Sequence, residues 1–183
     1  MVCVCAPIFV KCLSMIRICQ PSDKERIYFI INEAAKAYDG VIPPDCYHHP
    51  YMPRDELEQE MKEMTFFGWE KNGELVGVVG FQPIRNVTLI RHAYVLPQWQ
   101  RQGIASKLIE NMKRLCKTHR LLVGTWASAH WAIKLYQKHG FKLVPDKDEL
   151  LKTYWHIPRR QIETSVVLGM EVGKRVLEYY RKL

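Results

Sequence analysis

Residues 95–105 read Val95-Leu96-Pro97-Gln98-Trp99-Gln100-Arg101-Gln102-Gly103-Ile104-Ala105, a polar loop that joins two apolar segments. The segment before it, residues 87–95, has the composition of a buried strand. The segment after it, residues 103–117, carries apolar side chains at helical spacing. The sequence therefore predicts a strand, a loop and the N-terminus of a helix in this order.

Such a junction is suited to binding an anion. The first turn of a helix offers unpaired N–H groups and a partial positive charge. Gly103 has no Cβ and Ala105 has a small side chain, so an anion can approach the backbone closely. Arg101 and Lys107 add full positive charges, which suits a pyrophosphate.

A second motif lies about thirty residues downstream, after one further predicted strand. It reads Ala132-Ile133-Lys134-Leu135-Tyr136-Gln137-Lys138-His139-Gly140-Phe141. Each motif alone recurs by chance, but the two in this order and at this spacing are specific. Together they resemble the acetyl-CoA-binding signatures of the GNAT superfamily of N-acetyltransferases, and the resemblance covers roughly residues 15–170.

Periodicity and turn residues predict a mixed α/β (α+β) chain in the order β-α-α-β-β-β-α-β-α-β-β. Ser22 and Glu25 have the spacing of a capping box before the first helix, which ends at Gly40. Asn72-Gly73 predicts a hairpin. The resemblance implies the GNAT fold, a central mixed, mostly antiparallel, twisted sheet of about six to seven strands flanked by helices. The remaining expected elements are strands at 16–20, 65–71, 75–82, 121–125, 141–144 and 163–170, and helices at 54–64 and 129–139.

The length of 183 residues fits one domain. We expect residues 1–14 to be a loose N-terminal extension, residues 15–170 to be the acetyltransferase domain and residues 171–183 to form a terminal helix. The six cysteines form no Cys-x-x-Cys pair, and no apolar run approaches the ~20 residues of a membrane span. These features predict a cytoplasmic protein that does not cross a membrane; a homodimer stays open.

The net charge of +8 admits a nucleic acid, a membrane surface or a phosphorylated ligand as partner. Residues 91–145 hold ten Lys or Arg and one Glu, a local net charge of +9. Because this excess surrounds the predicted phosphate loop, it favours one CoA over a nucleic acid.

The resemblance implies transfer of an acetyl group, or another acyl group, from CoA to a primary amine of a small molecule or peptide. The amine attacks directly in a ternary complex, without a covalent enzyme intermediate and without a metal. The resemblance assigns the pantetheine arm to a strand edge and the pyrophosphate to the loop. The strand residues are Ala93, Tyr94 and Val95, and the loop residues are Gln100, Arg101, Gln102, Gly103, Ile104, Ala105 and Ser106.

The resemblance also assigns catalytic roles. Tyr136 stands at the position of the general acid that protonates the leaving thiolate. The backbone N–H of Val95 is expected to polarise the thioester carbonyl. The general base stays open among His92, Glu70 and a chain of water molecules.

Two departures from the family pattern leave a second function open. Residues 123–126 read Val-Gly-Thr-Trp and lack the carboxylate that some members carry, and Ala129 replaces a frequent Asn. A CoA-binding module without catalysis is therefore the alternative, and a basic nucleic-acid-binding domain is a more distant one.

The loop between the first two helices offers candidate acceptor contacts. Cys46, His48 and His49 lack a fourth metal ligand, so we interpret them as a wall of the substrate site. Asp45, Tyr47 and Tyr51 are further candidate lining residues. The acidic run at 55–60 could attract a cationic amine, but we interpret it as a solvated helix face.

Overall fold

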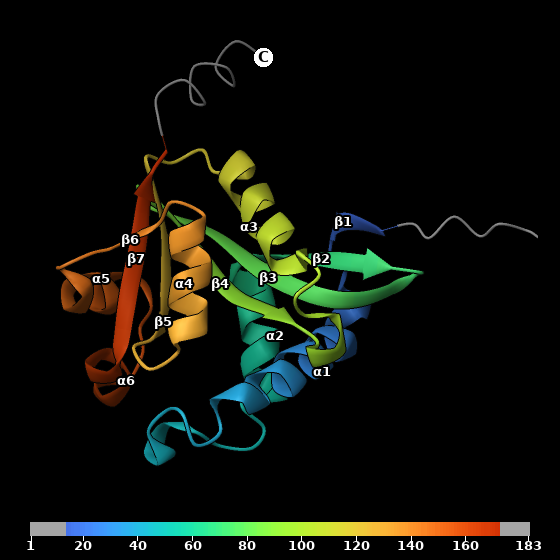
Figure 1. Cartoon of the computed structure of the whole chain (residues 1–183), viewed down its shortest axis with the longest axis horizontal. Coiled ribbons are helices and arrows are strands. Elements are labelled where there is room, and N and C mark those ends of the chain that lie inside the picture. The colour runs from blue at the N-terminus through green and yellow to red at the C-terminus, as the bar shows by residue number, and fades with distance from the viewer. Residues whose placement is uncertain (1–13, 173–183) are drawn as a thin grey trace, which may run out of the picture.

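The computed structural model of the chain describes residues 14–172, in which one twisted sheet of seven strands carries helices on both faces (Figure 1). The strand order is β1-β2-β3-β4-β5-β7-β6, and only β4 and β5 pair in parallel. The expected mixed, mostly antiparallel sheet is therefore confirmed. The strands are β1 Ser14–Ile18, β2 Thr65–Lys71, β3 Glu74–Ile84, β4 Val87–Val95, β5 Arg120–Trp126, β6 Lys142–Leu143 and β7 Ser165–Glu171.

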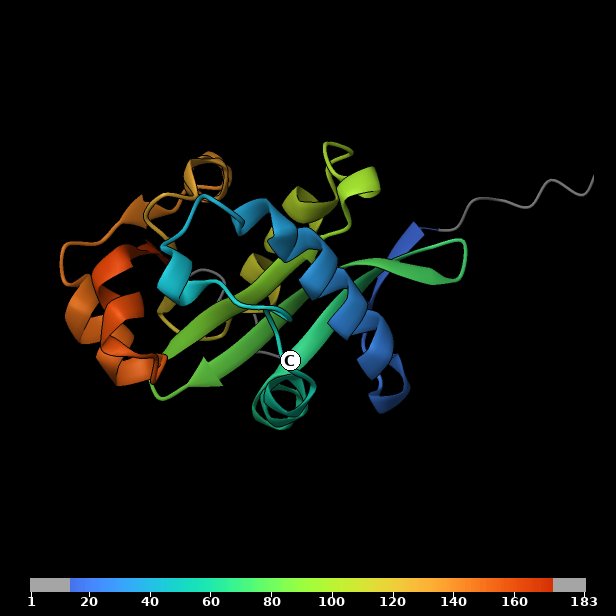
Figure 2. The same ribbon diagram turned by 90° about the horizontal axis from the view of Figure 1, so that it is seen from below.

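The helices divide between the two faces of the sheet. Figure 1 shows α3 and α4 in front of the sheet and α2 behind it, and Figure 2 shows α1 crossing the strands on the side toward the viewer. The helices α5 and α6 share the face of α2, since Glu56 of α2, Leu151 of α5 and Gln161 of α6 line the same cavity. The six helices are α1 Lys24–Ala35, α2 Arg54–Glu63, α3 Ile104–Leu115, α4 His130–Lys138, α5 Lys147–Tyr154 and α6 Arg159–Thr164.

Amphipathic spacing explains why α1 and α3 lie on the sheet. Ile27, Ile30 and Ile31 of α1 are completely buried, and so are Ile109 and Met112 of α3. Each such side chain contributes about 1.5–3 kcal/mol by leaving water. The two helices therefore clamp the central strands from opposite faces.

The hairpin predicted at Asn72-Gly73 is confirmed. Both residues have positive φ, 53° and 84°, which is the conformation of a tight two-residue turn. The turn sets β2 antiparallel to β3, and the pairing covers all of β2 and β3 as far as Phe81.

The central strands β4 and β5 separate partway along the sheet. Their parallel ladder joins Val87–Ile90 to residues 120–123 and then stops. The register between β3 and β4 shifts beyond this point, and His92 has a φ of 49°, so β4 carries a β-bulge there. A bulge bends its strand, and this bend turns the end of β4 away from β5.

The predicted capping box is wrong. The chain enters α1 through a short 3₁₀ turn, Pro21–Asp23, in which the Gln20 N–H donates to the Asp23 carboxylate at 2.6 Å. Glu25 instead pairs with Arg54 of α2 at 2.9 Å. The capping interaction therefore forms one turn earlier than predicted, between Gln20 and Asp23, which have the three-residue spacing of a capping box.

The C-terminal part differs from the expectation in its helices. The sequence analysis did not foresee α5 or α6, and it began the last strand at Glu163, whereas β7 begins at Ser165. Pro158 starts α6, and an ion pair between Arg159 and Glu163 one turn later supports it at 2.9 Å. Helices of six to eight residues are too short to show a clear hydrophobic periodicity, so the sequence did not predict α5 and α6.

The two ends of the chain are only partly described. Ser14 opens β1, and the other residues of the predicted extension, 1–13, lie outside the described residues. Glu171 closes β7, and the predicted terminal helix lies outside the described residues from 173 onward. Within residues 14–172, every helix is too short or too polar to cross a membrane.

Candidate active site

A cavity of about 700 Å³ opens where β4 leaves β5, between the start of α3 and the side of α4. Its size falls within the range of about 300–1,000 Å³ that small-molecule sites occupy. The predicted strand residues Ala93, Tyr94 and Val95 line it. So do all the predicted loop residues except Gln102, namely Gln100, Arg101, Gly103, Ile104, Ala105 and Ser106.

The loop geometry leaves helix amides free at this cavity. Gly103 caps α3 with a φ of 80°, and Arg101 also has a positive φ of 62°. The Lys107 N–H donates to the Gly103 carbonyl at 3.0 Å, so the amides before it have no helical acceptor. A Cβ built on Gly103 meets no atom within 4 Å, so the helix N-terminus is open to a ligand.

The loop is fixed to the end of β4 by one side chain. The Gln100 side-chain amide donates to the Val95 carbonyl at 3.0 Å. Gln102 points elsewhere, since its side-chain amide lies 3.4 Å from the Gln98 carbonyl and is exposed.

Part of the positive charge at the cavity comes from α4, whose lysines were not predicted to line it. Arg101 lines the cavity as predicted, and Lys134 and Lys138 of α4 join it. Lys107 does not, because its ammonium lies over the Trp69 ring, 4.8 Å from the centroid. Only three of the ten cations of residues 91–145 therefore line this cavity.

The end of β4 turns one amide toward the gap. The Leu96 N–H donates to the Val76 carbonyl of β3 at 3.0 Å, and Val95 lies opposite Gly77. In an antiparallel ladder, successive residues point their backbone groups to alternate sides. The Val95 N–H therefore points away from β3, toward the cavity.

Tyr136 lies at the cavity wall on α4. Its side chain is 6% exposed and packs edge-on against Phe141, with ring centroids 5.7 Å apart. Burial raises the pKa of Tyr136 far above its usual value, so the phenol stays protonated. Within residues 14–172, the Tyr136 hydroxyl has no hydrogen-bond partner.

A second cavity of about 190 Å³ lies on the other face of the sheet, next to the first. Tyr51, Trp126 and Trp155 supply aromatic walls, and Glu56 supplies a carboxylate. Burial raises the pKa of Glu56. Both cavities share a set of residues at the gap between β4 and β5: Tyr38, Ile90, His92, Tyr94, Gly124 and Thr125.

His92 lies at this shared wall beside a buried ion pair. Arg91 binds Glu60 of α2 at 2.6 Å, and His92 Nε2 lies 3.2 Å from the second Glu60 oxygen. Both atoms are buried, and neither has another hydrogen-bond partner among the described residues. Burial alone would raise the pKa of Glu60, but His92 and Arg91 together hold it below its usual value.

Several predicted residues lie elsewhere. The Glu70 carboxylate pairs with Arg17 of β1 at 2.6 Å and lines neither cavity. Cys46 and His48 line the smaller cavity, whereas His49 packs against Tyr47. Among residues 14–172, no group of three or more His, Cys, Asp or Glu side chains is arranged to hold a metal ion.

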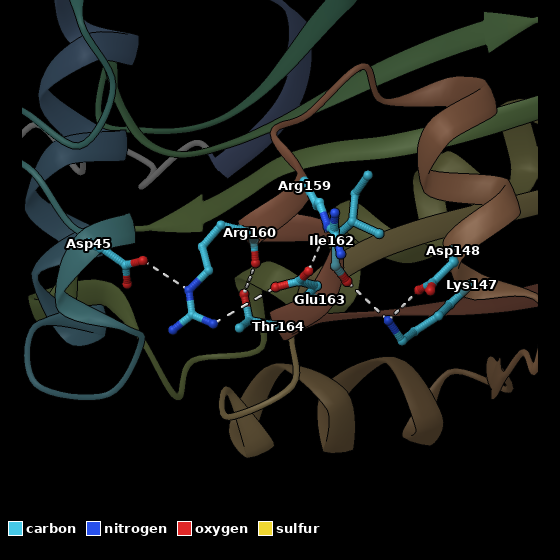
Figure 3. Close-up of polar contacts among 8 residues, drawn as sticks. All are labelled: Asp45, Lys147, Asp148, Arg159, Arg160, Ile162, Glu163 and Thr164. Carbon is cyan, nitrogen blue, oxygen red and sulfur yellow. Dashed lines mark hydrogen bonds and ion pairs between the residues drawn. The ribbon is translucent and has the colours of Figure 1, made fainter.

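The unforeseen helix α6 links to the loop after α1. Figure 3 shows the Arg160 side chain reaching Asp45, which it binds at 2.9 Å. Lys147 of α5 donates to the Ile162 carbonyl at 3.0 Å near the C-terminal end of α6. Because Cys46 and Gln161 line the smaller cavity, these contacts hold two of its walls together.

Sequence reasoning missed Glu60, Lys134, Lys138 and the α5–α6 wall. The two lysines lie inside the second motif, one helical turn apart. This spacing places them on the same side of the predicted helix, so the sequence could have indicated a shared positive charge there. No sequence pattern distinguished Glu60 from its neighbours, because a run of acidic residues on a helix is typical of a solvated face.

Comparisons with known proteins agree with this arrangement. The sequence model of the acetyltransferase (GNAT) family matches residues 27–141. The fold is similar to the ribosomal-protein-S18-alanine N-acetyltransferase from Escherichia coli, with a TM-score of 0.64, 16% identity and coverage of 88% of this chain and 95% of that one. It is also similar to the PaiA N-acetyltransferase from Thermoplasma acidophilum in complex with coenzyme A, with a TM-score of 0.66, 16% identity and coverage of 87% and 99%.

A third similar structure is the N-acetylglutamate synthase from Neisseria gonorrhoeae, complexed with coenzyme A and N-acetyl-glutamate. Its TM-score is 0.64 at 21% identity, over 89% of this chain and 36% of that one. The family match, together with this fold, identifies the chain as an acyltransferase that uses an acyl-CoA donor. The family match covers more than half of the sequence, and the chain belongs to the acetyltransferase (GNAT) family.

Proposed function

We propose that this protein transfers an acetyl group from acetyl-CoA to a primary amine of a small molecule or peptide, by direct attack in a ternary complex. The meeting of two cavities at the gap between β4 and β5 carries this proposal. One cavity has free helix amides and three cations, which suit the phosphates of CoA. The other has aromatic walls and a carboxylate, which suit an amine.

When bound, acetyl-CoA supplies a thioester carbonyl that a neutral amine can attack. The Val95 N–H donates to the carbonyl oxygen as negative charge develops there. Tyr136 donates a hydrogen bond, and finally a proton, to the sulfur as its bond to carbon breaks. The raised pKa of Tyr136 keeps that proton available at neutral pH.

His92 is the general base in this scheme. It lines both cavities, so it can receive the proton that the amine loses as the new bond between nitrogen and carbon forms. The Glu60 carboxylate, 3.2 Å away, stabilises the imidazolium that results. Glu70 is not needed in this role, since it lies in an ion pair outside both cavities.

Thiol release from acetyl-CoA, measured against a panel of primary amines, tests the function. We expect turnover with at least one amine and an acetylated product by mass spectrometry. His92→Gln should lower the rate about 100-fold without weakening CoA binding. His49→Gln is the matched control, since His49 packs on Tyr47 outside both cavities.

The second candidate is a CoA-binding module without catalysis. β5 has no Asp or Glu side chain. Ala129 stands where the family often has a polar Asn, and its side chain is completely buried against Ile42 and Trp126. CoA binding without turnover on any amine would favour that candidate. Salt-sensitive binding to oligonucleotides without CoA binding would contradict both.

A further inference from the structure

Ser106, in the first turn of α3, is hydrogen-bonded to a buried histidine of the second motif. His139 Nε2 lies 3.0 Å from Ser106 Oγ, and His139 Nδ1 lies 2.7 Å from Glu110 Oε1. The His139 side chain is 9% exposed, whereas Ser106 lines the larger cavity. A chain of hydrogen bonds thus joins the cavity, through a buried imidazole, to a carboxylate at the surface.

The carboxylate determines which imidazole nitrogen carries a proton. Lys113 donates to Glu110 at 2.9 Å and, together with His139, holds the pKa of Glu110 below its usual value. An ionised carboxylate only accepts hydrogen bonds. His139 Nδ1 therefore carries a hydrogen whether the ring is neutral or charged.

The charge of the ring then decides how the Ser106 hydroxyl points. In the neutral ring, Nε2 is an acceptor, so the hydroxyl hydrogen points at His139 and oxygen lone pairs face the cavity. In the charged ring, Nε2–H donates to the oxygen, which leaves the hydroxyl hydrogen for another acceptor. Only the charged ring lets Ser106 donate to an anion in the cavity while it keeps its hydrogen bond to His139.

We propose that His139 takes up a proton when a phosphate of the CoA donor binds at the first turn of α3, and that this proton turns the Ser106 hydroxyl toward the phosphate. The inference rests on the CoA site of the proposed function. His139 is a positioning residue, since it acts through Ser106 rather than on the donor itself.

The charges around His139 are compatible with this switch. Glu110 favours the charged ring, whereas Lys113, whose ammonium also lies 3.2 Å from the His139 carbonyl, and the preceding Lys138 oppose it. A phosphate separated from the ring by one hydroxyl adds negative charge on the other side. Its binding therefore shifts the balance toward the charged ring.

Proton uptake on binding is the direct test. Calorimetry in buffers of different ionisation enthalpy counts the protons bound with a ligand. Dephospho-CoA is the probe, because it keeps the pyrophosphate but lacks the phosphomonoester that itself titrates at a pH of about 6. We expect the full chain to take up as much as about one proton at some pH between about 6 and 9.

Two variants and a control separate the switch from a structural role. His139→Gln can donate to Ser106 at every pH through its amide, so we expect no proton uptake and an affinity independent of pH. Ser106→Ala should bind dephospho-CoA about tenfold more weakly and without uptake. His119→Gln changes an exposed histidine beyond the end of α3 and should retain the uptake of the unmodified chain.

Binding without proton uptake at any pH in this range, or equal uptake by His139→Gln, would overturn the inference and leave the acetyltransferase proposal standing. Failure of both dephospho-CoA and CoA to bind the unmodified chain would overturn the inference together with that proposal.

Discussion

Ile90 of β4 and Val123 of β5 form the last pair of the parallel ladder between the two central strands. Beyond this pair β4 stays bound to β3, and β5 stays bound to β7. The gap is therefore bounded on both sides by antiparallel pairing, which carries a bulge on the β3 side. Its edges offer backbone groups that no strand satisfies, and an extended ligand arm can pair with them.

The first prediction concerns Gly103, where α3 begins. Gly103→Glu should abolish measurable CoA binding by calorimetry, because it places bulk and negative charge at the free amides. It should also cost about 1–2 kcal/mol of stability, since φ is 80°.

Gly73→Glu is the matched control, because Gly73 has a similar φ of 84° and open space around its Cβ position but lies in the β2–β3 turn. It should lose similar stability but bind CoA normally; equal CoA affinity in both variants would show that the phosphate loop lies elsewhere.

The second prediction concerns the Tyr136 hydroxyl. Tyr136→Phe should lower kcat about 100-fold or more, since it removes the acid that meets the departing sulfur, while the Kd for CoA stays unchanged. Tyr154→Phe is the control, because its hydroxyl donates to Asn86 outside both cavities. Thiol release and calorimetry measure the two quantities. An unchanged kcat in Tyr136→Phe would assign the acid role to another group.

The third prediction concerns the buried pair of Glu60 and Arg91. Glu60→Gln should lower the free energy of unfolding at neutral pH by about 3–5 kcal/mol, because it leaves the Arg91 guanidinium buried beside the neutral Gln82 amide without an opposite charge. Since the pKa of Glu60 is lowered in the folded state, the stability that Glu60 contributes is complete above the ordinary glutamate pKa of 4.5 and is lost as the pH falls through the lower pKa of the folded state.

Thermal unfolding at a series of pH values checks this sign. The difference in Tm between Glu60→Gln and the unmodified chain should be constant near neutrality and should shrink below pH 4.5. Glu58→Gln, on the exposed side of the same helix, should change Tm little at any pH. A difference that grows on acidification would mean that the carboxyl is protonated in the folded state.

The fourth prediction concerns Ala129, which stands where the family often has Asn. Ala129→Asn should not raise thiol release, because position 129 is packed against Ile42 and Trp126 rather than open to the acceptor cavity. It should lower the free energy of unfolding by about 1–3 kcal/mol, since it buries an amide without partners. Ala127→Asn is the control at an exposed position nearby. Faster turnover in Ala129→Asn would refute this account of the position.

The sequence by itself determined most strands of the sheet, its main helices and the loop that begins α3. These features are local: Gly103 supplies the positive φ, and the apolar stripe of α3 sets the helix that follows. The hairpin at Asn72-Gly73 is local for the same reason. Each depends on residues within one or two turns of chain, so the pattern is readable without the fold.

Only the tertiary structure decided which side chains contact the proposed catalytic and binding residues. Glu60 reaches His92 from α2, and Ser106 meets His139 across the groove between α3 and α4. The tertiary structure also places α6 at the wall of the smaller cavity, where Arg160 binds Asp45. These contacts join segments distant in sequence, and their distances are set by how helices pack on a twisted sheet. No local pattern encodes that packing, and for this reason the acidic run around Glu60 was interpreted as a solvated face.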